Sequence, residues 1–294
     1  MTRSIKSFLR LLKDSGTAWL DDGCPRLGAA LAFYTIFSLA PVLIIAISIA
    51  GFVFGPDAVQ GHVVAQIQAL IGRDAAHTVQ SMIENAHRSQ SGVVATIFGV
   101  ATLLIGATAV FGELQDAFNI IWRSKPKAQN FWLTLVISRL LSFSLVIAIG
   151  FLMLVSLIAS AVITAFAGYL QSMVGATGPF LTLVSSATSF VILAVLFTLL
   201  FKILPSADVA WRDVWLGGVI TAVLFGIGKS AIGLYLGNSG IASTYGAAGS
   251  LVVLLLWIYY SAQILLLGAE FTHLHSTQRK LIVNLNNTIS QHSV

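Results

Sequence analysis

Long runs of apolar residues, separated by short polar stretches, dominate this sequence. Each run reaches or exceeds the roughly 20 residues that cross a bilayer as a helix. Residues 56–92 are more polar and repeat apolar side chains at helical spacing, which predicts two short amphipathic helices outside the hydrocarbon. We therefore predict an all-α polytopic membrane protein with six transmembrane helices, at about 27–54, 93–121, 131–163, 179–201, 214–236 and 245–267.

Residues 2–20 place apolar and basic side chains on separate helical faces. The apolar face holds Ile5, Phe8, Leu9, Leu12 and Trp19. This pattern is typical of an amphipathic helix that lies in the headgroup layer. A disordered basic leader is the alternative, because Ser and Gly interrupt the segment. Residues 1–275 are then expected to form one membrane domain, and residues 276–294 a polar cytoplasmic tail.

Composition agrees with this pattern. The chain has 294 residues, of which 57% are hydrophobic and only 9% are charged. An average soluble domain carries about 25% charged residues, so this chain lacks the charge to cover a surface that faces water. The single cysteine, Cys24, excludes an intramolecular disulfide.

The basic residues of the loops predict the orientation of the chain. Twelve of the 16 Lys and Arg lie in the N-terminal segment, the 122–130 and 202–213 loops and the tail. The loops on the opposite side hold only Arg73 and Arg88. Cytoplasmic loops carry the excess of Lys and Arg, so both termini are expected in the cytoplasm.

Charged residues inside the second and third predicted helices are candidate site residues. Arg139 lies about 12 Å below the membrane boundary, at 1.5 Å per residue, and Glu113 and Asp116 lie at a similar depth. Asn119 continues their spacing of three residues on one helical face. A charge at the bilayer centre costs about 2.5–3.5 kcal/mol, so opposite charges at equal depth are expected to pair. Such an ion pair either lines a path for a substrate or only holds the two helices together.

The first and sixth predicted helices add uncharged polar side chains and one carboxylate. A proline inside a helix also frees a backbone carbonyl. We expect these residues to line a polar cavity that opens to the cytoplasmic half of the membrane. The positions are Tyr34, Ser38, Pro41, Tyr260, Gln263 and Glu270.

Small residues recur at every fourth position of the fifth predicted helix. They are Gly218, Ala222, Gly226 and Ser230. Such spacing lets helix backbones approach closely, and packing within the chain is the favoured interpretation over a dimer interface.

The sequence offers no recognisable catalytic motif. It has no phosphate-binding Gly-rich loop with a following Lys-Ser/Thr, and no Cys or His pair at metal-ligand spacing. His273 and His275 are two residues apart, without an evident third ligand. We expect no enzymatic activity, no cofactor and no metal site.

Several motifs together resemble the YihY/BrkB family of bacterial inner-membrane proteins. They are RLGAALAFYT at 26–35 with Ser38 and Pro41, FNIIW at 118–122, Pro205, Trp211, Gly217, Tyr235, YGAAG at 245–249, Trp257 and GAE at 268–270. The resemblance covers about residues 20–275. It implies six membrane helices, both termini inside, a location in the inner membrane and no established biochemical activity.

The resemblance also implies links to serum resistance and to the export of envelope lipid or lipopolysaccharide. The family has carried the label ribonuclease BN, which this sequence does not support. A ribonuclease needs a basic surface of RNA size and an acid–base or metal group, and the short cytoplasmic loops provide neither. Nucleic acid is therefore not an expected partner.

Two functions remain open. The favoured one is a transporter or flippase-like protein for an amphipathic anionic envelope lipid, with membrane lipids as partners. Arg139 would bind the anionic group, and the carboxylates Glu113, Asp116 and Glu270 would gate it or carry protons. The basic residues at the cytoplasmic rim would receive the headgroup; they are Arg26, Lys202 and Arg212. The alternative is a non-catalytic scaffold in envelope assembly; a membrane hydrolase ranks third, for lack of a nucleophile. The sequence leaves a homo-oligomer open.

Overall fold

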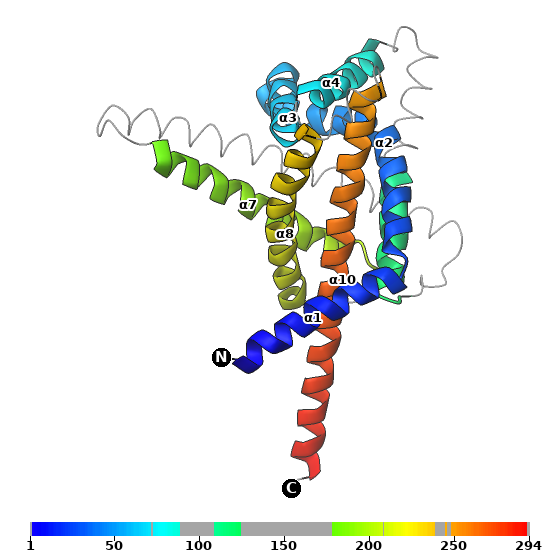
Figure 1. Ribbon diagram of the computed structural model, residues 1–294, viewed down its shortest axis with the longest axis vertical. Coiled ribbons are helices and arrows are strands. Elements are labelled where there is room, and N and C mark those ends of the chain that lie inside the picture. The colour runs from blue at the N-terminus through cyan, green and yellow to red at the C-terminus, as the bar shows by residue number, and fades with distance from the viewer. Residues whose placement is uncertain are drawn as a thin grey trace.

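The computed structural model describes most of the chain, and every regular element in its described part is helical (Figure 1). The predicted membrane helix 131–163 falls wholly outside that part, and the predicted helix 93–121 falls outside it as far as residue 108. The described residues are 2–71, 73–88, 109–124, 178–207, 209–238, 245 and 248–292.

One long helix forms the axis of the structure. This helix, α10 (Gly249–His292), runs the length of the molecule in Figure 1. Helix α8 (Trp211–Asn238) and helix α2 (Cys24–Phe54) both pack along α10. Helix α7 (Gly178–Ile203) packs against α8, and its first half extends away from the bundle (Figure 1).

The two ends of the bundle are covered by shorter helices. Helix α1 (Thr2–Asp21) crosses α10 at one end, which we call the α1 end. Helices α3 (Pro56–Ile71) and α4 (Arg73–Arg88) pack on each other and on α2 at the opposite end, the α3–α4 end (Figure 1). The chain therefore begins and ends on the same side of the bundle in Figure 1.

Glycines with positive φ make the two sharp turns at the ends of α2. Gly23 has φ 68° and separates α1 from α2, and Pro25 follows in the first turn of α2, where its missing N–H costs nothing. Gly55 has φ 84° and separates α2 from α3. Only glycine adopts this backbone region readily, so the two turns fix α1 and α3 across the ends of the bundle.

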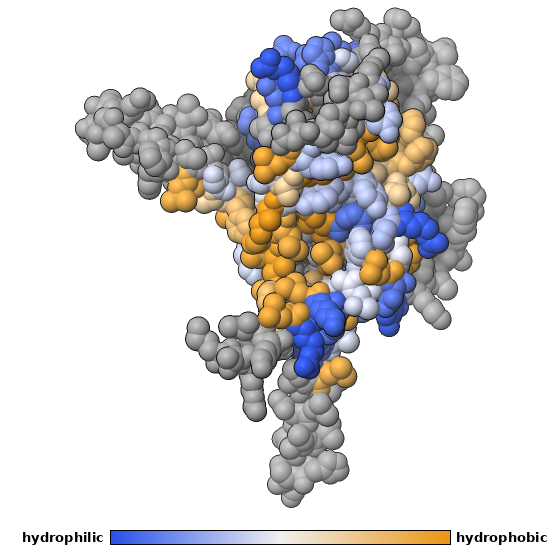
Figure 2. Space-filling view, in the orientation of Figure 1, coloured by the Kyte–Doolittle hydropathy of each residue, from blue (hydrophilic) through white to orange (hydrophobic). Residues whose placement is uncertain are grey.

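Three helices in the described part are long and apolar enough to cross a bilayer. Their apolar stretches are Ser186–Ile203, Trp211–Tyr235 and Gly249–Arg279, and α2 contributes a shorter one, Cys24–Ala40. Figure 2 shows a broad apolar area over the left and centre of the middle of the molecule, with hydrophilic side chains toward both ends and on the right of the middle. The chain is thus a helical membrane protein, while six crossings and the side of the termini stay predictions.

The observed helices extend beyond several predicted boundaries. The segment predicted as a polar tail, residues 276–294, is part of α10 as far as His292. A helix of 44 residues is about 66 Å long at 1.5 Å per residue, more than twice the thickness of the hydrocarbon core. Its C-terminal part therefore projects past α1 (Figure 1).

The α3–α4 end has a hydrophobic core of its own. Val59, Val63, Val79 and Ile83 are buried against α2 and against the first turns of α10. The hydroxyl of Thr78 donates to the hydroxyl of Ser250 across the same contact, at 2.9 Å. These interactions attach the two amphipathic helices to the bundle.

Paired glycines and threonines bring α8 and α10 together. Gly217 of α8 faces Thr272 of α10, and Gly268 of α10 faces Thr221 of α8, so closely that a β-carbon on either glycine would overlap the threonine. Each threonine hydroxyl donates to the carbonyl four residues earlier in its own helix, at 2.7 Å. The antiparallel pairs thus form a close contact with satisfied hydroxyls.

The small-residue spacing of the fifth predicted helix is only partly a packing surface. Gly218 lies against Thr198 of α7, and Ala222 is buried. Nothing in the described part approaches the position of a β-carbon on Gly226, and Ser230 is exposed. Packing within the chain therefore uses the first half of this pattern, and Gly217, one residue outside it, makes the contact with α10.

A buried carboxylate connects α8 with the projecting part of α10. Asp213, only 3% exposed, lies in the first turn of α8. Arg279 donates to its Oδ1 at 2.8 Å, and His275 Nδ1 lies 3.8 Å from the same oxygen. This ion pair holds the C-terminal part of α10 at the α1 end.

Replacing Gly217 by alanine should destabilise the protein, because the added methyl group overlaps Thr272. We expect a loss of about 1–3 kcal/mol, the usual cost of overpacking. Gly226→Ala is the matched control on the same helix, where the gain in helix propensity is the same but no side chain stands in the way. Thermal unfolding in detergent checks both; equal midpoints for the two variants would contradict the close contact.

Arg279→Gln should destabilise the α1 end, because it leaves the buried Asp213 carboxylate without its charged donor. The expected loss is about 1.5–3 kcal/mol, typical of a hydrogen bond to a charged group. Arg212→Gln is the control, since Arg212 is an exposed neighbour of Asp213. Detergent melting curves in which Arg212→Gln loses as much stability as Arg279→Gln would refute the role of this ion pair.

Candidate functional site

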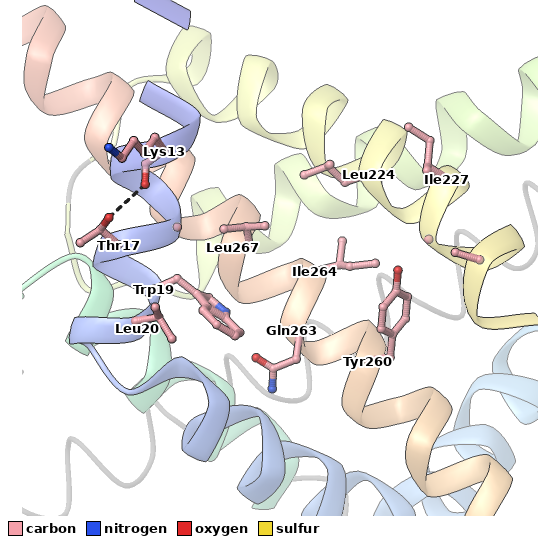
Figure 3. Close-up of a pocket in the computed structure, with 13 residues that line it drawn as sticks. Lys13, Thr17, Trp19, Leu20, Leu224, Ile227, Tyr260, Gln263, Ile264 and Leu267 are labelled. Carbon is pink, nitrogen blue, oxygen red and sulfur yellow. Dashed lines mark hydrogen bonds between the residues drawn. The ribbon is translucent and has the colours of Figure 1, made fainter. Parts of the chain in front are cut away.

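A cavity of about 650 Å³ lies between α1, α8 and α10. Its apolar wall comes from α8 and α10, and α1 closes one side. Its polar lining side chains are Lys13, Thr17, Trp19, Tyr260 and Gln263 (Figure 3). The remaining lining residues are Gly16, Leu20, Leu224, Ile227, Gly228, Ala231, Ile264 and Leu267.

Two of the residues predicted as a polar site line this cavity. Tyr260 and Gln263 project from α10, one turn apart (Figure 3). The hydroxyl of Tyr260 reaches α8 beside Gly228, where a β-carbon would block it. Gln263 extends toward α2, where its carboxamide rests against the backbone of Gly28. Glycines on two neighbouring helices therefore make room for the two polar side chains.

Glu270 lies apart from the cavity lining, two turns along α10 toward the α1 end. It is 1% exposed, and the Cys24 thiol lies 3.9 Å from its Oε1. Asp22, in the turn between α1 and α2, and Arg123 lie within electrostatic range of its carboxyl group. Glu270 is thus enclosed within a polar cluster where α1, α2 and α10 meet.

Glu113, Asp116 and Asn119 share one helix, at residues 109–121, but not one environment. The opposite side of this helix is its buried one, with Leu114, Ala117 and Phe118 in the core; Asp116 is exposed and Glu113 is half-buried. Their predicted partner, Arg139, lies outside the described residues. None of the three lines the cavity.

Asn119 has a clear structural role. Its Oδ1 accepts hydrogen bonds from the Ser124 hydroxyl and from the backbone N–H of Ser206, each at 2.9 Å. Ser206 lies in the segment that follows α7. Asn119 therefore attaches that segment to the end of the 109–121 helix.

The polar residues predicted on the first membrane helix lie within α2 and outside the cavity lining. Tyr34 is 39% exposed, and its ring packs edge-on against Phe33 at 5.7 Å. Ser38 is buried and donates to the carbonyl of Thr35 at 3.2 Å. The helix continues through Pro41 to Phe54. α2 instead contributes Gly28, against which Gln263 rests.

Lys202 is predicted as part of a basic rim that receives a lipid headgroup, but in the structure its side chain contacts the loop between α7 and α8. Its Nζ donates to the carbonyl of Val209 at 2.6 Å and lies 5.8 Å from the centre of the Trp211 ring. These contacts stabilise the connection between α7 and α8. The basic side chain that lines the cavity is Lys13, which is exposed at its edge.

Sequence reasoning missed the contribution of α1 to the cavity. Amphipathic spacing indicates that Trp19 faces an apolar surface, but not whether that surface is lipid or protein. In the structure Phe8 of α1 packs edge-on against Phe271 of α10 at 6.0 Å, so α1 is docked on the bundle. Its Lys13 and Trp19 lie six residues apart, a separation of about 9 Å along the helix.

Comparison with known proteins identifies the family of this chain. A family model described as virulence factor BrkB matches residues 16–287. A UPF0761 membrane protein of Ralstonia nicotianae is 28% identical over 85% of this chain and 55% of its own length. Those of Verminephrobacter eiseniae and Pseudomonas aeruginosa are 30% and 29% identical, over 83% and 85% of this chain and 57% and 59% of their own lengths.

The names of these relatives state a membrane protein and no reaction or ligand. The chain spans somewhat more than half the length of the curated relatives that it matches. No solved structure matches it. Because the family model covers nearly the whole chain, this helical membrane protein belongs to the virulence factor BrkB family.

Proposed function

We propose that this protein is a non-enzymatic carrier for an amphipathic anionic lipid of the bacterial envelope, located in the inner membrane. The observation that carries the proposal is the cavity between α1, α8 and α10. It combines an apolar wall on two helices long enough to cross a bilayer with a cationic side chain at its edge. An anionic lipid complements both features, because one molecule carries an apolar chain and a negative charge.

The size and lining of the cavity support a lipid ligand. Cavities of about 300–1,000 Å³ with a mainly apolar lining and few polar groups are typical of small-molecule sites. Leu224, Ile227 and Ile264 offer branched aliphatic surface for an acyl chain. Lys13 offers a charge for a phosphate, and a lysine near an anionic membrane surface contributes about 1 kcal/mol.

The intramembrane charges complete the proposed path. Arg139 would bind the anionic headgroup during its passage, and Glu113, Asp116 and Glu270 would gate the path or carry coupling protons. The sealed position of Glu270 beside Asp22 and Cys24 favours a proton or gating role over direct lipid contact. With both termini in the cytoplasm, as the loop charges predict, the cavity edge at Lys13 would face the inner leaflet.

A scaffold in envelope assembly is the second candidate. The feature that favours it is the C-terminal part of α10, which projects beyond the bundle as a helix (Figure 1). Such a helix is suited to contact a partner protein. Loss of an envelope phenotype on truncation after residue 280, with lipid movement unchanged, would favour the scaffold over the carrier.

Blocking the cavity should stop lipid movement. We expect purified protein in liposomes to move a labelled anionic phospholipid between leaflets faster than empty liposomes do, and Ala231→Trp to remove most of this activity by filling the cavity. Ser230→Trp is the matched control on the neighbouring, exposed position of α8 that does not line the cavity. Equal activity in the two variants, both shown to be folded, would contradict the cavity as the path.

Arg139→Ala should abolish movement of an anionic phospholipid, because the headgroup loses its counter-charge inside the membrane. Movement of a neutral phospholipid analogue should fall much less. The dithionite-quenching assay used for labelled lipids in liposomes reports both. Unchanged movement of the anionic lipid by folded, inserted Arg139→Ala would remove this residue from the path.

A further inference from the structure

Three buried polar atoms at the cavity have no hydrogen-bond partner in the described part of the chain. They are Nε1 of Trp19 and both Nε2 and Oε1 of the Gln263 carboxamide. Both side chains line the cavity, and Figure 3 shows them on the same side of it. Buried polar groups are nearly always hydrogen-bonded, so a cluster of unpartnered ones beside a cavity points to a missing partner there.

The neighbouring helix does not offer that partner. The Gln263 carboxamide rests against Gly28, whose N–H and carbonyl lie inside α2, where backbone groups are bonded along the helix. The Thr17 hydroxyl, also in the cavity lining, donates to the carbonyl of Lys13 at 3.2 Å. A ligand in the cavity can satisfy Trp19 and Gln263 once these side chains turn toward it from the enclosed positions that they have in the structure.

The donors and acceptors of the two side chains determine which hydrogen-bonding groups the ligand must carry. Trp19 offers one donor, and Gln263 offers a two-hydrogen donor and an acceptor. A carbonyl oxygen accepts from the indole and the amide nitrogen. The remaining acceptor, Oε1, needs a donor on the ligand, which an ester linkage lacks and an amide N–H supplies.

We propose that Trp19 and Gln263 bind the carbonyl linkage of a lipid acyl chain, and that they favour an amide linkage over an ester. The inference rests on the proposed lipid function and names the chemical class of the ligand. The acyl chain lies against Leu224, Ile227 and Ile264. The charged headgroup lies toward Lys13, about 9 Å from Trp19 along α1, within reach of a phosphate two carbons beyond the amide.

Three matched probes test the linkage directly. N-palmitoylethanolamine phosphate, its oxygen ester and its alkyl ether differ only at the atoms that would meet Trp19 and Gln263. Calorimetric titration of the full-length protein in detergent measures the affinity for each. We expect the amide to bind about fivefold tighter than the ester, as one hydrogen bond of ~1 kcal/mol predicts, and the ether to bind most weakly.

Variants assign the preference to the two side chains. Gln263→Met keeps the length and volume of the side chain and should bind the amide and the ester equally. Trp19→Phe should weaken the amide and the ester alike and leave the ether unchanged. Gln66→Met, at an exposed position of α3 at the opposite end of the bundle, should behave as the wild type.

The outcomes separate this inference from the proposed function. Equal affinity of the wild type for all three probes would overturn the linkage preference and leave a lipid cavity in place. A preference for the amide that persists in folded Gln263→Met would also overturn it. Failure of all three probes to bind, with no lipid movement in liposomes, would overturn the carrier itself.

Discussion

The close approach of α8 and α10 is the constraint on which the rest of the structure depends. In a bilayer the hydrophobic effect does not drive one helix onto another, so small residues and internally satisfied hydroxyls must do so. Gly217 against Thr272 and Gly268 against Thr221 supply this contact near the α1 end. Further along, Tyr260 and Ile264 of α10 reach Gly228 of α8, and all three residues line the cavity. The same pair of helices is thus both the central contact and the wall of the site.

The polar residues of the membrane domain divide between two environments. Glu270 is enclosed with Cys24 where three helices meet, a position that, under the proposed function, suits coupling better than contact with a ligand. Gln263, two turns away on the same helix, lines the cavity and carries unpartnered atoms. A single helix therefore places an enclosed carboxylate and the amide of a cavity-lining residue two turns apart. This arrangement fits a carrier in which ligand binding and coupling occur at neighbouring levels.

Much of the helical order was predictable from the sequence, because apolar runs and helical spacing depend on local pattern. The site was less predictable. Tyr260 and Gln263 follow from the rule that polar residues inside a membrane helix face protein, but Tyr34 obeys the same rule and lies exposed beside Phe33. The cavity depends on where α1 docks, and that depends on contacts distant in sequence, such as Phe8 on Phe271. The role of Asn119 as a loop attachment was hidden for the same reason.

Photolabelling with a diazirine-bearing acyl lipid tests the central claim most directly, because it asks where an acyl chain resides in the intact protein. The account predicts labels on the less exposed part of the cavity wall, at Leu224 and Ile264, with labelling suppressed by excess unlabelled lipid. Labels confined to outward-facing side chains such as Leu183 and Val191, which are 67% and 54% exposed, would show that lipid only surrounds the protein and would contradict a lipid-binding cavity.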